Sequence, residues 1–277
     1  MMGQIYLDLT NEFNQGQLRA ILSSGQAVVV HGLALASKDG DWIVREDAET
    51  LDRILEVLEK FETRYRFGAP LDARWMRGGW SAHLEFIHQG NRIRCDFVAR
   101  PPRILPRDLA ALWDEQARGE GVQEPVPTLD LRRLAEIKKT DRERDYPFIG
   151  EIARRLPTLD EQILLSRSAR DLMKLWPQMS QEQQQLLASQ RPLLEQIPQG
   201  REVLETALDK ERRDLARINE ERLAQFGRAS TAWAARWLTL KAEVALLPLR
   251  EAHSILVDEA AKFLPQNPQE VSPSPSP

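Results

Sequence analysis

The pattern of apolar residues changes near residue 125, and this change limits the chain to a fold with two different parts. Residues 1–125 contain short apolar runs separated by turn residues, which is typical of strands. Residues 128–264 are rich in Leu, Ala, Glu, Gln and Arg, a composition that favours helices. We therefore predict an α+β fold in which a mixed sheet with flanking helices, at 1–125, precedes an all-α domain at 128–264.

Two polar segments are predicted to lie outside these domains. Residues 117–128, ARGEGVQEPVPT, are rich in Gly, Pro and charge, which is typical of a linker. Residues 265–277, PQNPQEVSPSPSP, contain too few apolar side chains to form a core, so we expect a disordered Pro/Ser tail.

Several elements of the first part can be placed from their patterns. The predicted elements are strands at 26–35, 41–44, 83–88 and 91–99 and a helix at 47–61. Gln89-Gly90 joins the last two strands, so they are expected to pair antiparallel. The segment 26–35 starts with a β-branched run that ends at Gly32, which predicts a buried strand.

The composition indicates an ordinary soluble protein. Neither an early apolar leader segment nor an apolar run of about 18 residues occurs, so we expect a cytoplasmic protein without membrane spans. The single cysteine, Cys95, lies in a predicted strand and is expected to be a core residue. The net charge of -4 gives no general attraction to nucleic acid.

Three aspartates are the candidate catalytic and metal-binding residues. Asp39 and Asp41 are alternate residues, so in a strand they share one face about 6.5 to 7 Å apart. Apolar and charged residues alternate in 91–99, and Asp96 lies on the charged face. If 41–44 and 91–99 are neighbouring strands, the three carboxylates repel one another unless divalent cations neutralise them. The alternative is that Asp39-Gly40-Asp41 forms a solvent-exposed turn that binds no metal.

Other metal sites fit the sequence less well. A calcium EF-hand would need an oxygen ligand where Ile43 stands. His83 and His88 are five residues apart in one strand and therefore point to opposite faces, which argues against zinc.

Residues from about 25 to 156 resemble a known superfamily in the order of their motifs. The segments VVVHG, KDGDWIV and RCDFV are followed by LDLRRLAEIKKTDRERDYPFIGEIARRL at 129–156. This order is similar to that of the DNA polymerase beta-type nucleotidyltransferases, especially the small bacterial members related to abortive-infection and minimal nucleotidyltransferases. The resemblance implies a nucleotidyltransferase-like sheet and the transfer of a nucleoside monophosphate from an NTP to a hydroxyl of RNA or protein, with release of pyrophosphate.

The resemblance also implies roles for individual residues. Asp39, Asp41 and Asp96 would bind Mg²⁺ or Mn²⁺, and Asp96 would act as, or beside, the general base. The candidate nucleotide-binding residues are His31, Gly32, Lys38, Arg94 and Lys138. Only residues 33–38 separate Gly32 from Asp39, so we expect no room for the short phosphate-binding helix that the family carries there.

A group of arginines surrounds Asp96, and two interpretations stay open. The group consists of Arg92, Arg94, Arg100, Arg103 and Arg107. It can form a positive rim that attracts a triphosphate or an RNA end, or it can pair with acids such as Glu85 or Asp108. Trp75 and Trp80 can stack on a base but are expected to lie in the core.

A second function is compatible with the same sequence. The short connection before Asp39 favours a catalytically inactive module that keeps the fold for binding or regulation. The helices from 158 onward could then bind a protein partner, such as a toxin, an antitoxin or a component of phage defence. We expect no membrane partner.

Overall fold

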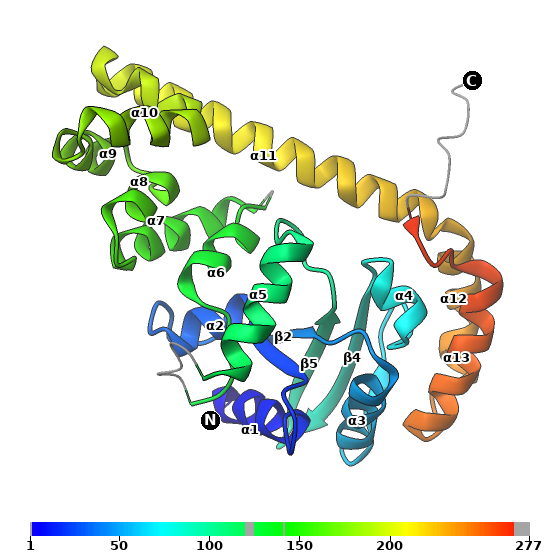
Figure 1. The fold of residues 1–277 in the computed structure, drawn as a ribbon. Helices are drawn as coiled ribbons and strands as arrows, with labels where there is room; N and C mark the ends of the chain where they lie inside the picture. The colour runs from blue at the N-terminus through cyan, green and yellow to red at the C-terminus, as the bar shows by residue number, and fades with distance from the viewer. Residues whose placement is uncertain (1, 120–124, 141, 269–277) are drawn as a thin grey trace, which may run out of the picture. The chain divides into compact units, whose positions relative to one another are not determined.

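The central element of the chain is a five-stranded mixed sheet. The structure is a computed structural model that describes residues 2–119, 125–140 and 142–268 (Figure 1). The strands are β1 Ala20–Ser23, β2 Asp39–Val44, β3 Arg64–Tyr65, β4 Ser81–His88 and β5 Asn91–Val98. They follow the order β1-β2-β5-β4-β3, in which β2 and β5 are parallel and the other neighbours are antiparallel. The predicted α+β class is confirmed.

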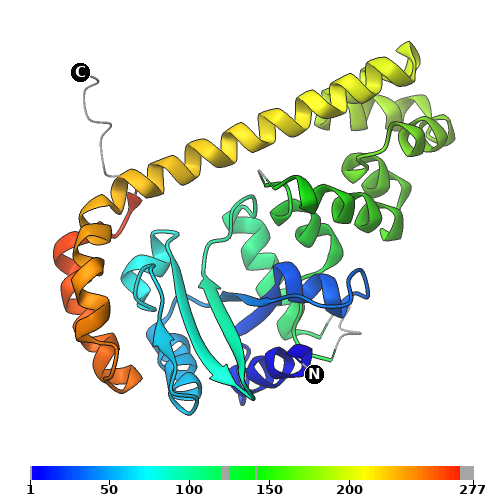
Figure 2. The same cartoon turned by 180° about the vertical axis from the view of Figure 1, so that it is seen from behind.

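Helices cover the apolar face of this sheet. The helices packed around the sheet are α1 Met2–Phe13, α2 Ser24–Val30, α3 Ala48–Glu59, α4 Ala73–Arg77, α5 Pro106–Ala117, α12 Thr231–Glu243 and α13 Leu249–Phe263. Of these, α1, α3, α4, α12 and α13 contribute buried residues to the hydrophobic core that includes the apolar face. Figures 1 and 2 show α1 and α3 on the same side of the sheet. Phe13 of α1 packs edge-on against Trp42 and Phe97, which stack on each other with centroids 5.3 Å apart. This aromatic group anchors α1 to the two parallel strands.

The helix predicted at 47–61 is confirmed as α3. Its N-cap is Asp47, whose carboxylate accepts a hydrogen bond from the Thr50 amide at 2.8 Å. Leu51, Ile54 and Leu58 recur at helical spacing and are buried in the core.

The β4–β5 hairpin forms as the alternation predicts. Gln89 and Gly90 both have positive φ, at 50° and 76°, which is the geometry of a two-residue type I′ turn. Ile93, Cys95 and Phe97 point into the core and are at most 1% exposed. The charged residues between them therefore lie on the opposite face.

The strand predicted at 26–35 is wrong, because this segment begins with helix α2. Gly32 follows the helix with φ 67°, and the Leu33 and Gly32 amides donate to the carbonyls of Val28 and Val29 at 2.9 Å. This is a Schellman motif, which stops the helix at a residue that tolerates the left-handed conformation. The valines have low helix propensity, but Val28 is buried and Val30 packs against the hydrophobic core, and this packing outweighs the local preference.

The chain forms two compact units, and their limits differ from the predicted domains. The first unit comprises 1–129 and 223–277, and the second comprises 130–222. Residues 223–264, which we expected in the helical domain, pack with the sheet instead. The physical reason is that α12 and α13 share its hydrophobic core, and Trp233 donates to the Gly68 carbonyl at 2.9 Å.

Part of the predicted tail is also held in the first unit. The indole N–H groups of Trp75 and Trp80 donate to the carbonyls of Leu264 and Pro265, at 3.1 and 2.9 Å. The disorder predicted from 265 therefore does not begin there. The rest of the predicted tail, 269–277, lies outside the described residues, as do residues 120–124 of the predicted linker.

The second unit is helical. Its helices are α6 Leu131–Ile137, α7 Tyr146–Arg155, α8 Leu159–Leu165, α9 Ala169–Leu175, α10 Gln181–Gln190 and the first part of α11 Arg201–Ala229. A capping box between Ser180 and Gln183 begins α10, as the sequence predicts. Throughout the described chain, every helix is too short or too polar to cross a membrane.

Candidate functional site

The sheet register brings two of the three predicted aspartates side by side. Asp41 of β2 is the direct partner of Asp96 on the parallel strand β5. Ser23 lies opposite Asp41 on β1, and His83 lies opposite Asp96 on β4. Residues paired in register point to the same face, so these four side chains form a polar row across the sheet.

Asp39 and Arg94 begin a second row on the same face. They are register partners, and the Arg94 guanidinium donates to the Asp39 carboxylate at 3.4 Å. Both side chains are about two-fifths exposed, at 41% and 39%. Glu85 of β4 is the next partner of Arg94 along this row. Asp39 is two residues before Asp41, which places both carboxylates on one face as predicted.

Asp96 is the more enclosed carboxylate and has two basic neighbours. His83 Nδ1 lies 2.8 Å from its Oδ1, and the Arg66 guanidinium donates to the same oxygen at 3.1 Å. The Asp96 side chain is 22% exposed. Ser81 Oγ lies 3.1 Å from the other ring nitrogen of His83, so the imidazole is held from both sides. Contacts of this kind fix the orientation of the carboxylate.

Buried polar contacts fix the start of β2. The Tyr6 hydroxyl donates to the Lys38 carbonyl at 2.7 Å, and burial raises the pKa of this phenol to about 12. The Gln26 amide donates to the carbonyls of Ser37 and Asp39. A Cβ on Gly40 would lie 2.5 Å from the rings of both Tyr6 and Trp42. Glycine between the two aspartates therefore lets the core pack directly under them.

The predicted nucleotide-binding residues near α2 have structural contacts of their own. Gly32 is the glycine of the Schellman motif and is exposed. His31 Nε2 lies 2.8 Å from the Leu129 carbonyl. Lys38 is exposed, directly before Asp39. As expected, no helix lies between Gly32 and Asp39. A short helix does occur upstream of Gly32: α2 begins directly after Ser23, which lies next to Asp41 in the sheet.

Lys138 lies in the second unit. Its ammonium group contacts the Asp145 carboxylate at 3.4 Å, and both residues are buried. Thr140 donates to the other oxygen of Asp145, also at 3.4 Å. Lys138 and Asp145, both in the segment 129–156 quoted for the resemblance, therefore belong to one local network.

The arginine group divides between the two interpretations. Arg94 contacts Asp39 within the candidate site, whereas Arg100 forms a two-bond pair with Glu46, at 2.9 and 3.0 Å. Glu85, which was a possible partner of this group, forms its ion pair with Arg66 instead, at 3.7 Å. Trp75 and Trp80 are at most 7% exposed, which confirms that they are core residues.

The carboxylates have the chemistry that Mg²⁺ requires but do not converge on one point. In the part of the chain that the structure describes, no three His, Cys, Asp or Glu side chains lie close enough to hold a metal ion. Arg94 and Arg66 neutralise Asp39 and Asp96 instead. A cation that takes carboxylate oxygens at about 2.1 Å would have to displace these guanidinium groups.

Sequence reasoning missed the partners of Asp96. We weighed His83 only as a zinc ligand, yet the two-residue turn at Gln89-Gly90 pairs His88 with Asn91 and hence His83 with Asp96. That register could have been counted from the turn. The contact of Arg66 with Asp96 could not be counted in this way, because Arg66 follows the two-residue strand β3, whose pairing no turn in the sequence indicates.

Comparisons with known proteins give no family for this chain. No protein-family profile matches it, and no curated protein matches it. Two solved structures from Helicobacter pylori show a distant likeness, each at 12% sequence identity. A proposed nucleotidyltransferase aligns with a TM-score of 0.41 over 79% of this chain and 96% of its own. The protein JHP933 aligns with a TM-score of 0.40 over 82% of this chain and 97% of its own.

Proposed function

We propose that the chain is a metal-dependent nucleotidyltransferase that moves a nucleoside monophosphate from an NTP to a hydroxyl of RNA or protein. The observation that carries the proposal is the in-register pairing of Asp41 with Asp96 on parallel strands. Asp39 lies on the same face, two residues earlier in β2. The sequence resemblance assigns metal binding to the same three carboxylates.

Each side chain has a part in the proposed reaction. Asp39, Asp41 and Asp96 would hold Mg²⁺ or Mn²⁺, which would lower the pKa of the attacking hydroxyl and neutralise the phosphates. The acceptor oxygen forms a bond to the α-phosphorus, the bond from that phosphorus to the bridging oxygen breaks, and pyrophosphate leaves. Asp96 accepts the proton of the hydroxyl, and His83 holds Asp96 in position through their contact at 2.8 Å.

The arginines have a dual role in this proposal. Arg94 and Arg66 balance the acidic face before substrate arrives. With Mg²⁺ held by the carboxylates, the guanidinium groups of Arg94 and Arg66 would be free to pair with phosphate oxygens of the triphosphate.

The same ion pairs motivate a second candidate, a binding module without catalysis. Arg94 and Arg66 already neutralise Asp39 and Asp96, so the fold needs no metal to hold its acidic face together. In that case, the helices from 158 onward would bind a protein partner, such as a toxin or an antitoxin.

Thermal unfolding and pyrophosphate release test the two candidates. The chain is titrated with ATP, CTP, GTP or UTP, each with Mg²⁺ or Mn²⁺. At a hundredfold excess over Kd, a bound nucleotide should add about 2.7 kcal/mol to the free energy of unfolding. Asp41→Asn should remove this gain, whereas the matched control Asp108→Asn, on exposed α5, should keep it. The nucleotidyltransferase is refuted if no nucleotide stabilises the chain, or if both variants behave alike.

A further inference from the structure

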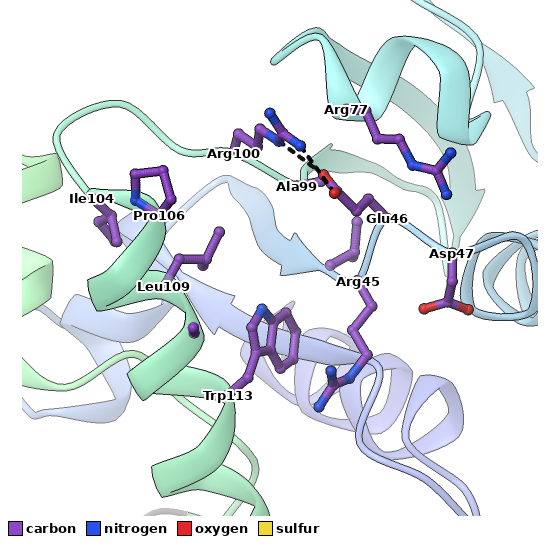
Figure 3. A pocket seen from close by; sticks show the side chains of 12 residues that line it. Arg45, Glu46, Asp47, Arg77, Ala99, Arg100, Ile104, Pro106, Leu109 and Trp113 are labelled. Atoms are coloured by element: carbon purple, nitrogen blue, oxygen red, sulfur yellow. Dashed lines mark hydrogen bonds and ion pairs between the residues drawn. The ribbon is translucent and has the colours of Figure 1, made fainter.

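A pocket of about 430 Å³ lies at the carboxyl ends of β2 and β5, away from the aspartates. Val44, the last residue of β2, lies five positions after Asp39 and three after Asp41, which corresponds to about 16 and 10 Å along the strand. The pocket is lined from the ends of both strands, from α5 and from Arg77 at the end of α4 (Figure 3). It is therefore a separate site from the one proposed for nucleotidyl transfer.

The walls of this pocket are mainly apolar. They include Val44, Ala99, Ile104, Leu109 and the indole of Trp113. Figure 3 shows the side chains of Leu109 and Trp113 on α5, on the same side of the pocket. A concave space of this size, with apolar walls and a few charged groups, is typical of a small-molecule site.

The two carboxylates that line the pocket already have partners. Asp47 caps α3, accepting from the Thr50 amide at 2.8 Å and from the Thr50 hydroxyl at 3.0 Å. Glu46 receives two hydrogen bonds from Arg100, which the dashed lines in Figure 3 mark. Both negative charges are thus used within the protein, and the charge of Arg100 is balanced by Glu46.

Among the described residues, Arg45 and Arg77 at the pocket have no carboxylate partner. The Arg45 guanidinium lies 4.5 Å from the centre of the Trp113 ring, and its Nε donates to the Leu18 carbonyl at 2.9 Å. Arg77 is exposed at the rim, and within the described residues no hydrogen bond or ion pair involves its side chain. The contact with Trp113 holds Arg45 against the apolar wall, so charge and apolar surface meet at one place.

We propose that this pocket binds a small organic anion with an aromatic or apolar body. The body packs against Trp113 and Leu109, and the carboxylate or phosphate group faces Arg45 and Arg77. An organic cation fits less well, because Glu46 and Asp47 are already engaged. The unbalanced guanidinium groups favour anions, and the apolar walls favour a body larger than an inorganic ion.

Titration calorimetry with two matched probes tests the charge requirement. The full chain is titrated with 2-naphthoate and with its neutral analogue 2-naphthalenemethanol, at about 50 mM salt, so that screening stays limited. We expect 2-naphthoate to bind with one-to-one stoichiometry and the neutral analogue to bind at least about fivefold more weakly. Equal affinities for the two probes, or no binding of 2-naphthoate, would overturn the proposal.

Variants then locate the probe. Arg77→Gln should weaken 2-naphthoate binding about fivefold, and Ala110→Glu, which places a carboxylate at the exposed wall, should weaken it more than tenfold. Arg107→Gln is the matched control, because Arg107 is 82% exposed on α5 and does not line the pocket. Asp41→Asn should also leave the affinity unchanged, which separates this site from the proposed active site. If Arg77→Gln and Arg107→Gln give the same affinity, the proposal is refuted.

Discussion

Protonation of His253, on α13, should lower the free energy of unfolding of the first unit, which contains the sheet, in mild acid. Its Nδ1 lies 2.8 Å from the Tyr65 hydroxyl, and the two rings stack with centroids 6.0 Å apart. The Leu71 amide donates to the Tyr65 oxygen at 3.2 Å, so the Tyr65 hydroxyl proton is available for His253. This arrangement requires a neutral imidazole that accepts at Nδ1.

The size of the effect follows from the pKa of His253. Burial lowers this pKa from 6.5 to about 4, while the Asp72 carboxylate acts against the shift and Arg250 adds to it. The unfolded chain therefore binds a proton that the folded chain rejects. The stabilisation is fully present above pH 6.5 and is lost as the pH falls towards 4. Between about pH 7.5 and pH 5, the loss is about 2 kcal/mol, at roughly 1.36 kcal/mol per pKa unit.

Urea unfolding at the two pH values measures this loss in the wild type and in His253→Phe. Tryptophan fluorescence suits the purpose, because six of the seven tryptophans lie in the first unit. Phenylalanine keeps the ring but cannot titrate. The variant should lose about 1 kcal/mol at pH 7.5, through the missing hydrogen bond, and should be the more stable protein at pH 5.

Tyr65→Phe is the matched control for the cause of the shift. It removes the hydrogen bond to His253 but leaves the imidazole buried, so most of the acid sensitivity should persist. The reasoning is refuted if the wild type and His253→Phe lose the same free energy between the two pH values.

Three further changes test the packing inside the first unit or inside the second. Gly40→Ala should destabilise the sheet unit by about 1 to 3 kcal/mol in urea unfolding, because the added methyl group meets the buried Tyr6 ring. Glu211→Gln leaves the buried guanidinium of Arg191 without its carboxylate partner, and the second unit should lose about 3 to 5 kcal/mol, measured by circular dichroism during urea unfolding. Deletion of 223–277 uncovers two core tryptophans and should abolish the cooperative thermal transition of the sheet unit, followed by tryptophan fluorescence.

The hairpin could be predicted because its signals are local and periodic. Alternation in 91–99 fixes which side chains face the core, and a two-residue turn fixes the register. The sequence placed Asp96 near Asp39 and Asp41 only on the condition that the two strands are neighbours. The structure fulfils this condition and adds that the strands are parallel. It does not confirm a metal, because the carboxylates lie against arginines.

The errors occurred where tertiary packing outweighs local preference. The valines of α2 favour a strand. However, the position beside β2 in the sheet is occupied by β1, whose four residues are all buried. Similarly, α12 and α13 have the composition of a helical domain, and composition does not indicate which core a helix covers. The indole donors of Trp75 and Trp80 find their acceptors at residues 264 and 265, and no local pattern could predict a contact at that separation.

The position of α2 changes the interpretation of the aspartate site. From the sequence, only residues 33–38 separate Gly32 from Asp39, and this short connection is one reason to expect an inactive module. In the structure, no helix lies between these two residues, but α2 precedes Gly32 and starts after Ser23, the register partner of Asp41. A short helix therefore does lie between β1 and the aspartate strand β2, although at a different place. The ion pairs of the arginines are the second reason to expect an inactive module, and metal competition with Arg94 for Asp39 decides between the two candidates.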